Sequence, residues 1–255
     1  IRGVCKTAIN HYGMEVYGIH SGFRGLLDND ITPLTDKDLT GLLNMGGTIL
    51  GTSREKPFKK RTSSQNKPAL MLKTIQEMQL DCLVCIGGNG TQKTANKLAQ
   101  LGVNVVSIPK TIDNDVWGTE TSFGFDTAVT IATEAIDRLH STASSHQRVM
   151  VIEVMGHKAG WIALHSGMAG GGDIILITEI EYNIRKIGNT IIKKIKKGKN
   201  LLKNVCRLTL FALYAYYESL RLFCRLDYFC YICMGAKYKF SNFGVAKLMK
   251  IYNFA

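Results

Sequence analysis

The chain has 255 residues, of which 45% are hydrophobic and 20% charged, and its formal net charge is +12 at pH 7. This composition is typical of a globular chain that is long enough for one large domain or two ordinary ones. We do not expect a membrane protein. The longest uncharged run in the C-terminal segment 201–255, which is rich in Tyr and Phe, is 208–217, and this is much shorter than the ~20 residues of a membrane-spanning helix.

The positive charge favours an anionic partner, either nucleic acid or a phosphorylated small molecule, without distinguishing between them. The seven cysteines are odd in number and show no regular spacing, so we do not expect a disulfide-rich secreted domain. The first residues show no basic and then apolar leader. We therefore expect a cytoplasmic protein, and a first residue Ile1 in place of Met indicates a fragment that lacks its native start.

Short apolar runs alternate with segments of helical periodicity along the first half of the chain. The expected elements in order are a strand at 14–20, a helix at 36–47, a helix at 67–80, a strand at 81–90 that runs into a glycine turn, a helix at 91–102 and a strand at 103–109. This succession predicts a parallel sheet of the doubly wound α/β kind.

The same alternation continues in the second half. The expected elements are a helix at 125–141, a strand at 148–156, a helix at 158–170, a strand at 173–180 and a basic helix at 184–197. We therefore expect two α/β domains, residues 1–124 and residues 125–200, joined near residue 125. In such folds ligands bind beyond the carboxyl ends of the strands, so the loops there are the candidates for chemistry.

Glycines fill the junction between the strand and the helix near residue 90. In GGNGT (87–91), glycine allows backbone N–H groups to approach a ligand, and the positive end of the helix dipole favours an anion. We expect a phosphate site here. A tight turn also requires glycine, so a purely structural turn remains the alternative.

A pair of acids follows the next apolar run. Asp113 and Asp115 lie two positions apart in PKTIDND (109–115), and in an extended segment their side chains point to the same side, about 6–7 Å apart. One carboxylate can then accept a proton while the other holds a cation or orients its neighbour. Asp and Asn are also common in turns, which is the alternative explanation.

Two later loops carry further candidate ligand groups. Arg148, in SSHQR, can present its guanidinium as a fork of donors to a phosphate, although a surface arginine is the commoner case. Met155, Gly156 and His157 fill the turn after the strand at 148–156. A histidine at such a place is by itself an ordinary capping or surface residue.

Taken in order, these segments resemble the family of 6-phosphofructokinases. The segments that carry the resemblance are IRGV, GGTILGTSR, IGGNGT, PKTIDND, FGFDTAV, EAIDRLHSTASSHQRVMVIEVMGHKAGWIAL and AGGGD. The resemblance implies two doubly wound parallel-sheet (Rossmann-like) domains. It also implies phosphoryl transfer, with Mg2+, to the 1-hydroxyl of fructose 6-phosphate by an allosteric, cytoplasmic homo-oligomer, a dimer or tetramer. It implies no nucleic-acid or membrane partner.

The resemblance also implies a role for individual residues. Asp113 matches the base that deprotonates the attacking hydroxyl. Donor-phosphate contacts are implied for Arg54, Gly88, Asn89, Gly90, Thr91 and Lys110. Sugar-phosphate contacts are implied for Thr111, Asp113, Asp115, Arg148, Met155, Gly156 and His157. Magnesium contacts are implied for Asp115 and for Asn89, where the family usually has Asp.

Two positions bear on the phosphoryl donor. Many pyrophosphate-dependent relatives have an acid where this chain has Gly90, and glycine leaves room for the α-phosphate of ATP. Lys110 points the other way, because pyrophosphate-using members have lysine there, although some ATP-using branches combine this glycine with this lysine. We expect ATP, with pyrophosphate as the alternative.

The resemblance stops short of a complete family member at both ends. A first strand and a Gly-rich loop of the family have no counterpart here, and residues 201–255 look unrelated to it. That tail holds seven of the ten Tyr and six of the ten Phe, and we expect it to derive from a shifted reading frame or a read-through intron. An RNA-binding tail is the functional alternative.

Two other functional classes remain as alternatives for the chain as a whole. A lipid or NAD kinase shares the GGxGT turn but is not expected to carry PKTIDND and SSHQR as well. A non-catalytic remnant would bind phosphates or partner subunits without turnover, and we expect little activity from the 255-residue chain alone.

Overall fold

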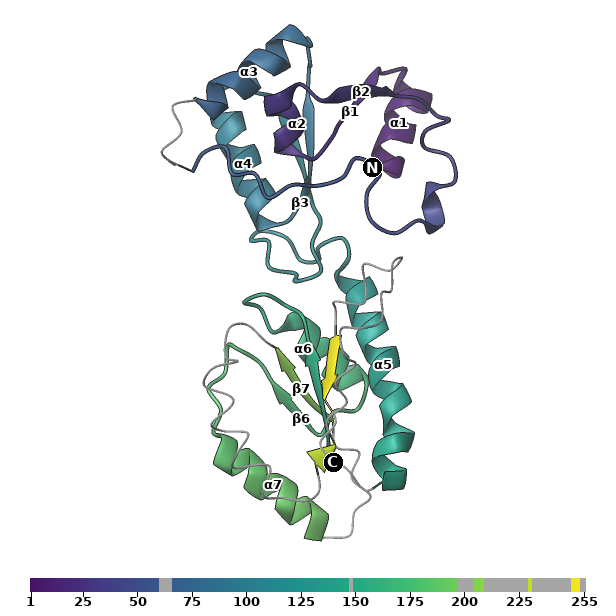
Figure 1. Ribbon diagram of the computed structural model, residues 1–255, viewed down its shortest axis with the longest axis vertical. Helices are drawn as coiled ribbons and strands as arrows, with labels where there is room; N and C mark the ends of the chain where they lie inside the picture. Colours follow the sequence, from purple (N-terminus) through teal and green to yellow (C-terminus); the bar gives the residue numbers. More distant parts are fainter. Residues whose placement is uncertain (60–65, 147–148, 197–203, 209–228, 231–248, 253–255) are drawn as a thin grey trace. The chain divides into compact units, whose positions relative to one another are not determined.

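The computed structural model describes residues 1–59, 66–146, 149–196, 204–208, 229–230 and 249–252 (Figure 1). The chain divides into two compact units, Ile1–Pro109 and Lys110–Ala255. This division falls between Pro109 and Lys110, the first two residues of PKTIDND. It lies earlier in the chain than the boundary at 124/125 that we expected from the sequence. The acidic loop therefore belongs with the second unit.

The first unit combines five helical elements of α or 3-10 type with two small sheets among its described residues. Its elements are α1 (Arg2–Tyr12), β1 (Val16–Ile19), α2 (Phe23–Asp28), β2 (Ile31–Leu34), η1 (Leu42–Asn44), α3 (Lys67–Glu77), β3 (Leu83–Gly87), α4 (Asn89–Gln100) and β4 (Val105–Pro109). Strands β1 and β2 pair antiparallel, and β3 and β4 pair parallel with Leu83 opposite Val105. Helices α1 and α2 and strand β2 were not expected from the sequence pattern.

One apolar core holds this unit together. Leu26 of α2, Met71 of α3 and Leu98 of α4 are fully buried in one cluster with Leu83 and Cys85 of β3. Large apolar side chains of this kind each contribute about 1.5–3 kcal/mol when they are removed from water. The core therefore fixes α4 against β3, and with it the glycine turn that joins them.

The helix expected over 36–47 does not form. Turns occupy most of this segment, and only a short 3-10 helix, η1, lies within it. Gly41 has a φ of 78°, a left-handed conformation that ends a helix. The hydroxyl of Thr40 donates to the backbone carbonyl of Asp36 at 2.9 Å, where a helix would place a backbone N–H. Local polar bonding thus overrides the helical pattern.

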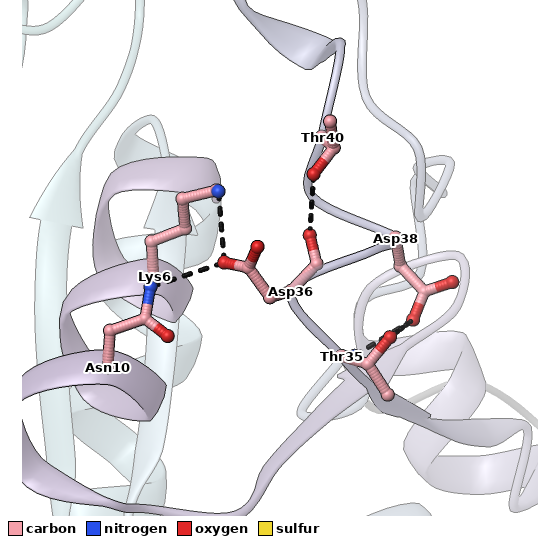
Figure 2. Close-up of polar contacts among 6 residues, drawn as sticks. All are labelled: Lys6, Asn10, Thr35, Asp36, Asp38 and Thr40. Atoms are coloured by element: carbon pink, nitrogen blue, oxygen red, sulfur yellow. Dashed lines mark hydrogen bonds and ion pairs between the residues drawn. The ribbon is translucent and has the colours of Figure 1, made fainter.

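Polar contacts tie the same turn to α1 (Figure 2). Lys6 and Asn10 of α1 both meet Oδ1 of Asp36, at 2.9 and 3.2 Å. On the next turn, Oδ2 of Asp38 accepts hydrogen bonds from the backbone N–H of Thr35 at 2.8 Å and from its hydroxyl at 2.6 Å. These carboxylates hold the backbone of the first unit and are not candidates for chemistry.

The second unit is a sheet with helices on both faces (Figure 1). Its described elements are α5 (Phe125–His146), β5 (Val149–Val154), α6 (Trp161–Ala169), β6 (Ile174–Leu176), α7 (Ile184–Lys196), β7 (Asn204–Leu208), β8 (Phe229–Cys230) and β9 (Met249–Tyr252). The strand order is β6-β7-β5-β8, all parallel, and β9 pairs antiparallel with β5.

Alternate residues of β5 face the two helical layers. Met150 and Ile152 pack in a cluster with residues of α5 and α6, whereas Val149 packs with Ile191 of α7. Because both faces of β5 are buried, its sequence VMVIEV is apolar at every position except Glu153. This pattern made a core strand predictable from the sequence. The expected doubly wound α/β architecture is confirmed for this unit.

Three short described strands lie within the C-terminal segment 201–255. β7, β8 and β9 all lie beyond residue 200, and β7 pairs with both β5 and β6. The remainder of 201–255 lies outside the described residues. In the part of the chain that the structure describes, no helix is long and apolar enough to cross a membrane.

Candidate active site

The GGNGT turn joins β3 to α4 in the first unit. A Cβ at Gly87 would lie 2.7 Å from Cβ of Thr91, so only glycine fits there. Gly88 is the N-cap of α4, and no side chain caps this helix end by a hydrogen bond. At Gly90 a Cβ would meet no protein atom within 4 Å. The turn therefore leaves open space beside a helix N-terminus, where an anion is favoured.

Gln92 holds this turn in place, although the sequence analysis did not single it out. Its Nε2 donates to the carbonyl of Gly87 at 2.8 Å and to the carbonyl of Ile108 at 3.1 Å. One side chain thus joins the carboxyl ends of β3 and β4. No local sequence signal reveals such a role, because both acceptors are backbone atoms of strands that only the fold brings together.

The GTSR segment presents Arg54 from the same unit. Arg54 is exposed, and we find no hydrogen bond or ion pair between it and other described residues. Its neighbour Glu55 accepts from Nζ of Lys67 at 2.9 Å, and this contact lowers the pKa of Glu55. The ammonium group of Lys97 lies 5.2 Å from the ring centroid of Phe58. An exposed guanidinium of this kind suits an anion contact.

The acidic loop opens the second unit. Asp113 is half-buried, and its backbone N–H donates to the hydroxyl of Thr111 at 3.2 Å. That hydroxyl lies 3.5 Å from Oδ2 of Asp113. Asp115 is also half-buried, whereas Lys110 is exposed and its backbone forms a bridge with Phe123. The fold thus places both acids and Thr111 in one short segment.

The pKa of Asp113 is raised above its ordinary value. Burial is the largest cause, and the negative charge of Asp115 adds to it; His157 and the Thr111 hydroxyl act in the opposite direction. Burial and a neighbouring like charge disfavour the ionised carboxylate, which makes it a better proton acceptor. The influence of His157 also shows that the turn after β5 lies close enough to Asp113 to affect its charge.

Met155, Gly156 and His157 follow β5 directly, as expected. Met155 and His157 are exposed and Gly156 is buried; His157 has a φ of 54°, the left-handed region that few residues other than glycine adopt. The neighbouring Ala159 donates its N–H to the carbonyl of Gly156 at 2.9 Å. The turn therefore exposes the side chains at 155 and 157 beyond the end of the strand.

Glu179 holds the helix that follows this turn. Its Oε1 accepts from the backbone N–H of Gly160, the N-cap of α6, at 2.7 Å. Burial raises the pKa of Glu179, but hydrogen bonds from Gly160, from its own backbone N–H and from Thr178 together lower it. A Cβ at Gly160 would lie 2.5 Å from Cβ of Ile177, so glycine is required there. The sequence motifs pointed to neither Gly160 nor Glu179.

The candidate residues divide between the two units. The first unit holds Arg54, Gly88, Asn89, Gly90 and Thr91, and the second unit holds Lys110, Thr111, Asp113, Asp115, Met155, Gly156 and His157. Arg148 lies outside the described residues. The grouping separates the expected donor contacts from the expected sugar contacts, with Lys110 at the start of the second unit.

The carboxylates fit a partial metal site. Mg2+ is commonly held by one or two carboxylates together with substrate phosphates, so a carboxylate such as that of Asp115 suits it. Among the described residues, no group of three or more His, Cys, Asp or Glu side chains is placed to hold a metal by itself. Burial raises the pKa of Cys85 to about 11, so this thiol suits core packing better than metal binding. Cys82 is exposed.

A sequence model described as phosphofructokinase matches residues 1–208 of this chain. The chain belongs to the phosphofructokinase family. The match extends past residue 200 to the end of β7, the strand between β5 and β6. The resemblance inferred from the sequence motifs is thereby confirmed.

Individual phosphofructokinases agree with this assignment. The chain is 77% identical over 201 residues to ATP-dependent 6-phosphofructokinase 3 of Bacteroides thetaiotaomicron, covering 78% of this chain and 60% of that protein. It is 56% identical over 205 residues to the ATP-dependent 6-phosphofructokinase of Spirochaeta thermophila, covering 78% of this chain and 56% of that protein. The chain thus spans about 60% or less of the length of these relatives.

A solved structure shares the fold. The phosphofructokinase of Saccharomyces cerevisiae superposes with a TM-score of 0.70 at 28% identity, covering 81% of this chain and 31% of that chain. The fold class expected from the sequence, a phosphofructokinase-type α/β architecture, is confirmed by this neighbour and by the parallel sheet of the second unit.

Proposed function

We propose that this phosphofructokinase chain carries the phosphate and sugar contacts for transfer of the γ-phosphoryl group of ATP to the 1-hydroxyl of fructose 6-phosphate, a step of glycolysis. The observation that carries the proposal is Asp113, a half-buried carboxylate with a raised pKa in the PKTIDND loop. A base of this kind is what activation of a sugar hydroxyl requires. The products are fructose 1,6-bisphosphate and ADP.

Asp113 acts as the general base. As the 1-hydroxyl oxygen attacks the γ-phosphorus, its proton moves to Asp113, and the bond from the γ-phosphorus to the bridging oxygen of ADP breaks. Thr111, whose hydroxyl accepts the Asp113 N–H, keeps the base in place and contacts the sugar phosphate. General-base catalysis of this kind contributes about 10²–10⁴-fold to a rate.

The donor phosphates bind at the GGNGT turn. Backbone N–H groups at Gly88–Thr91 and the N-terminus of α4 attract the negative charge, and Arg54 and Lys110 supply cations. When bound, Mg2+ neutralises charge on the transferring phosphate; Asp115 is its proposed protein contact, with Asn89 as a second candidate. Phosphoryl transfer depends mainly on such alignment and charge neutralisation.

The sugar phosphate binds to the second unit. Met155, Gly156 and His157 contact the sugar, Asp115 orients it, and Arg148 contacts its phosphate. Support comes from the position of the 155–157 turn after β5 and from its electrostatic influence on Asp113. Ligands of such sheets bind beyond the carboxyl ends of the strands, which is where this turn lies.

ATP is the proposed donor, and pyrophosphate is the alternative. The open space at Gly90 accommodates the further phosphate of a nucleotide, and both relatives described above are named ATP-dependent. Lys110 is the feature that favours pyrophosphate. We further propose that the protein works in the cytoplasm as a homo-oligomer, as the resemblance to allosteric family members implies.

The test compares two proteins. One is the full chain, and the other is a chimaera in which the 201 matched residues of this chain replace those of the Bacteroides thetaiotaomicron relative. Each is assayed for fructose 1,6-bisphosphate formation with Mg2+ and either ATP or pyrophosphate. We expect ATP-dependent turnover by the chimaera, lowered about 10²–10⁴-fold by Asp113→Asn. Phosphate binding without turnover by the chimaera would favour the non-catalytic alternative.

A further inference from the structure

Asn114 lies between the two acids of the site and has an unusual backbone conformation. Its φ is 51°, in the left-handed region that asparagine tolerates better than most residues. Its Oδ1 accepts the backbone N–H of Ser122 at 2.8 Å, and its Nδ2 donates to the carbonyl of Glu120 at 3.3 Å. The side chain thus closes the loop 114–122 on itself.

Ser122, the partner of Asn114, also forms a hydrogen bond with Thr111. It is 2% exposed, and its hydroxyl donates to the carbonyl of Thr111 at 2.8 Å. Thr111 in turn accepts the N–H of Asp113 on its own hydroxyl. A continuous set of hydrogen bonds therefore runs from Asn114 through Ser122 and Thr111 to Asp113. Hydrogen bonds therefore fix the chain both before and after Asp113, at Thr111 and at Asn114.

We propose that Asn114 and Ser122 are positioning residues that hold Asp113 at the place where it meets the attacking hydroxyl. This role rests on the proposed function of Asp113 as the base. We call these bonds the Asn114–Ser122 clasp. Neither residue needs to touch the substrate, because the clasp acts through the backbone of 111–114.

The physical reason is the short range of proton transfer. A base must come within hydrogen-bond distance of the proton it takes, and a displacement of about 1 Å can lower a rate roughly 100-fold. Short polar loops are otherwise among the more mobile parts of a protein. Buried bonds such as that of Ser122 strengthen the loop, because an unpaired buried polar group is costly.

The first experiment measures the clasp directly in the full chain. Asn114→Gly keeps access to the left-handed conformation but removes both side-chain bonds, and Ser122→Ala removes the bond to Thr111. Amide hydrogen exchange at Ser122 and Asp113 should accelerate about fivefold or more in Asn114→Gly, as expected for the loss of one hydrogen bond. Unchanged exchange at both amides would overturn the proposal.

The control variant is Thr119→Ala. The Thr119 hydroxyl donates to the carbonyl of Val116 at 2.7 Å, inside the same loop but outside the clasp. Thr119 is exposed, so its truncation should leave the exchange at Ser122 and Asp113 unchanged. If Thr119→Ala accelerates exchange as much as Asn114→Gly, the loop is held as a whole and the clasp has no special part.

The second experiment measures turnover in the chimaera defined above. Asn114→Gly and Ser122→Ala should each lower kcat roughly 10- to 100-fold and change the KM for fructose 6-phosphate less than kcat, because the base moves while the sugar contacts of the 155–157 turn stay. Normal kcat in both variants of an active chimaera would overturn the positioning role and leave the proposed function standing. An inactive unsubstituted chimaera would contradict the proposed function, and hydrogen exchange alone then decides whether the clasp exists.

Discussion

Replacement of Asp113 by Asn separates the catalytic role of this carboxylate from its effect on stability. The amide has nearly the same shape and can keep the contact with the Thr111 hydroxyl, but it cannot take a proton from a sugar hydroxyl. We expect kcat of the chimaera to fall about 10²–10⁴-fold, the range for loss of a general base. This loss corresponds to about 3–5 kcal/mol of transition-state stabilisation.

The same change should not destabilise the fold at neutral pH, and we expect it to raise Tm. Burial and Asp115 raise the pKa of Asp113 above its ordinary value, so ionisation costs the folded state free energy that the unfolded chain does not lose. At pH values between the pKa of Asp113 in the unfolded chain and its higher pKa in the folded chain, the native state binds more protons than the unfolded state. The stability of the native state therefore falls as pH rises through this range. Asn carries no such cost.

The raised pKa of Asp113 predicts that the difference in Tm between Asp113→Asn and the unsubstituted chain depends on pH. The advantage of Asp113→Asn should appear as pH rises through the folded pKa of Asp113 and vanish below about pH 4, the ordinary value for aspartate. The assay is thermal unfolding of the full chain between about pH 4 and pH 8, without nucleotide or added Mg2+, because a bound cation would offset the carboxylate repulsion.

The matched control is Glu120→Gln, which neutralises an exposed carboxylate in the same loop. It should change neither kcat nor the pH dependence of Tm. Two results would refute the reasoning: near-normal kcat in Asp113→Asn, or a Tm that falls relative to the unsubstituted chain as pH rises. The first would remove Asp113 as base, and the second would mean that its ionised form stabilises the fold.

Three further substitutions test other parts of the site. Gly160→Ala places a Cβ 2.5 Å from Cβ of Ile177, so we expect a loss of about 1–3 kcal/mol of stability in thermal or urea unfolding; an unchanged Tm would show that the contact relaxes without cost. A Cβ at Gly90 would meet no protein atom within 4 Å, so Gly90→Asp should not lower Tm but should raise the KM for ATP in the chimaera more than that for pyrophosphate, and equal effects on both donors would contradict the donor assignment. Gln92→Met keeps the side-chain size but removes the bonds to two strand ends, and we expect a higher KM for ATP; an unaltered KM would show that the turn holds its shape without them.

Much of the fold followed from local patterns. The strand VMVIEV was predictable because burial on both faces makes a strand almost entirely apolar. The helix from Phe125 was predictable because its apolar residues recur with a period of about 3.6 residues. The segment at 36–47 has a similar period but is not a helix. Thr40 and Gly41 decide its conformation through a side-chain bond and a left-handed backbone, which periodicity does not detect.

The sequence by itself determined the family, the glycine turn and the two acids, because residue type and spacing along the chain carry that chemistry. Only the tertiary structure decided how those acids are held. The bonds of Gln92, Asn114 and Glu179 all end on backbone groups, and a backbone donor or acceptor has no signature in the sequence. The raised pKa of Asp113 has the same origin, since it depends on burial and on charges that folding brings near.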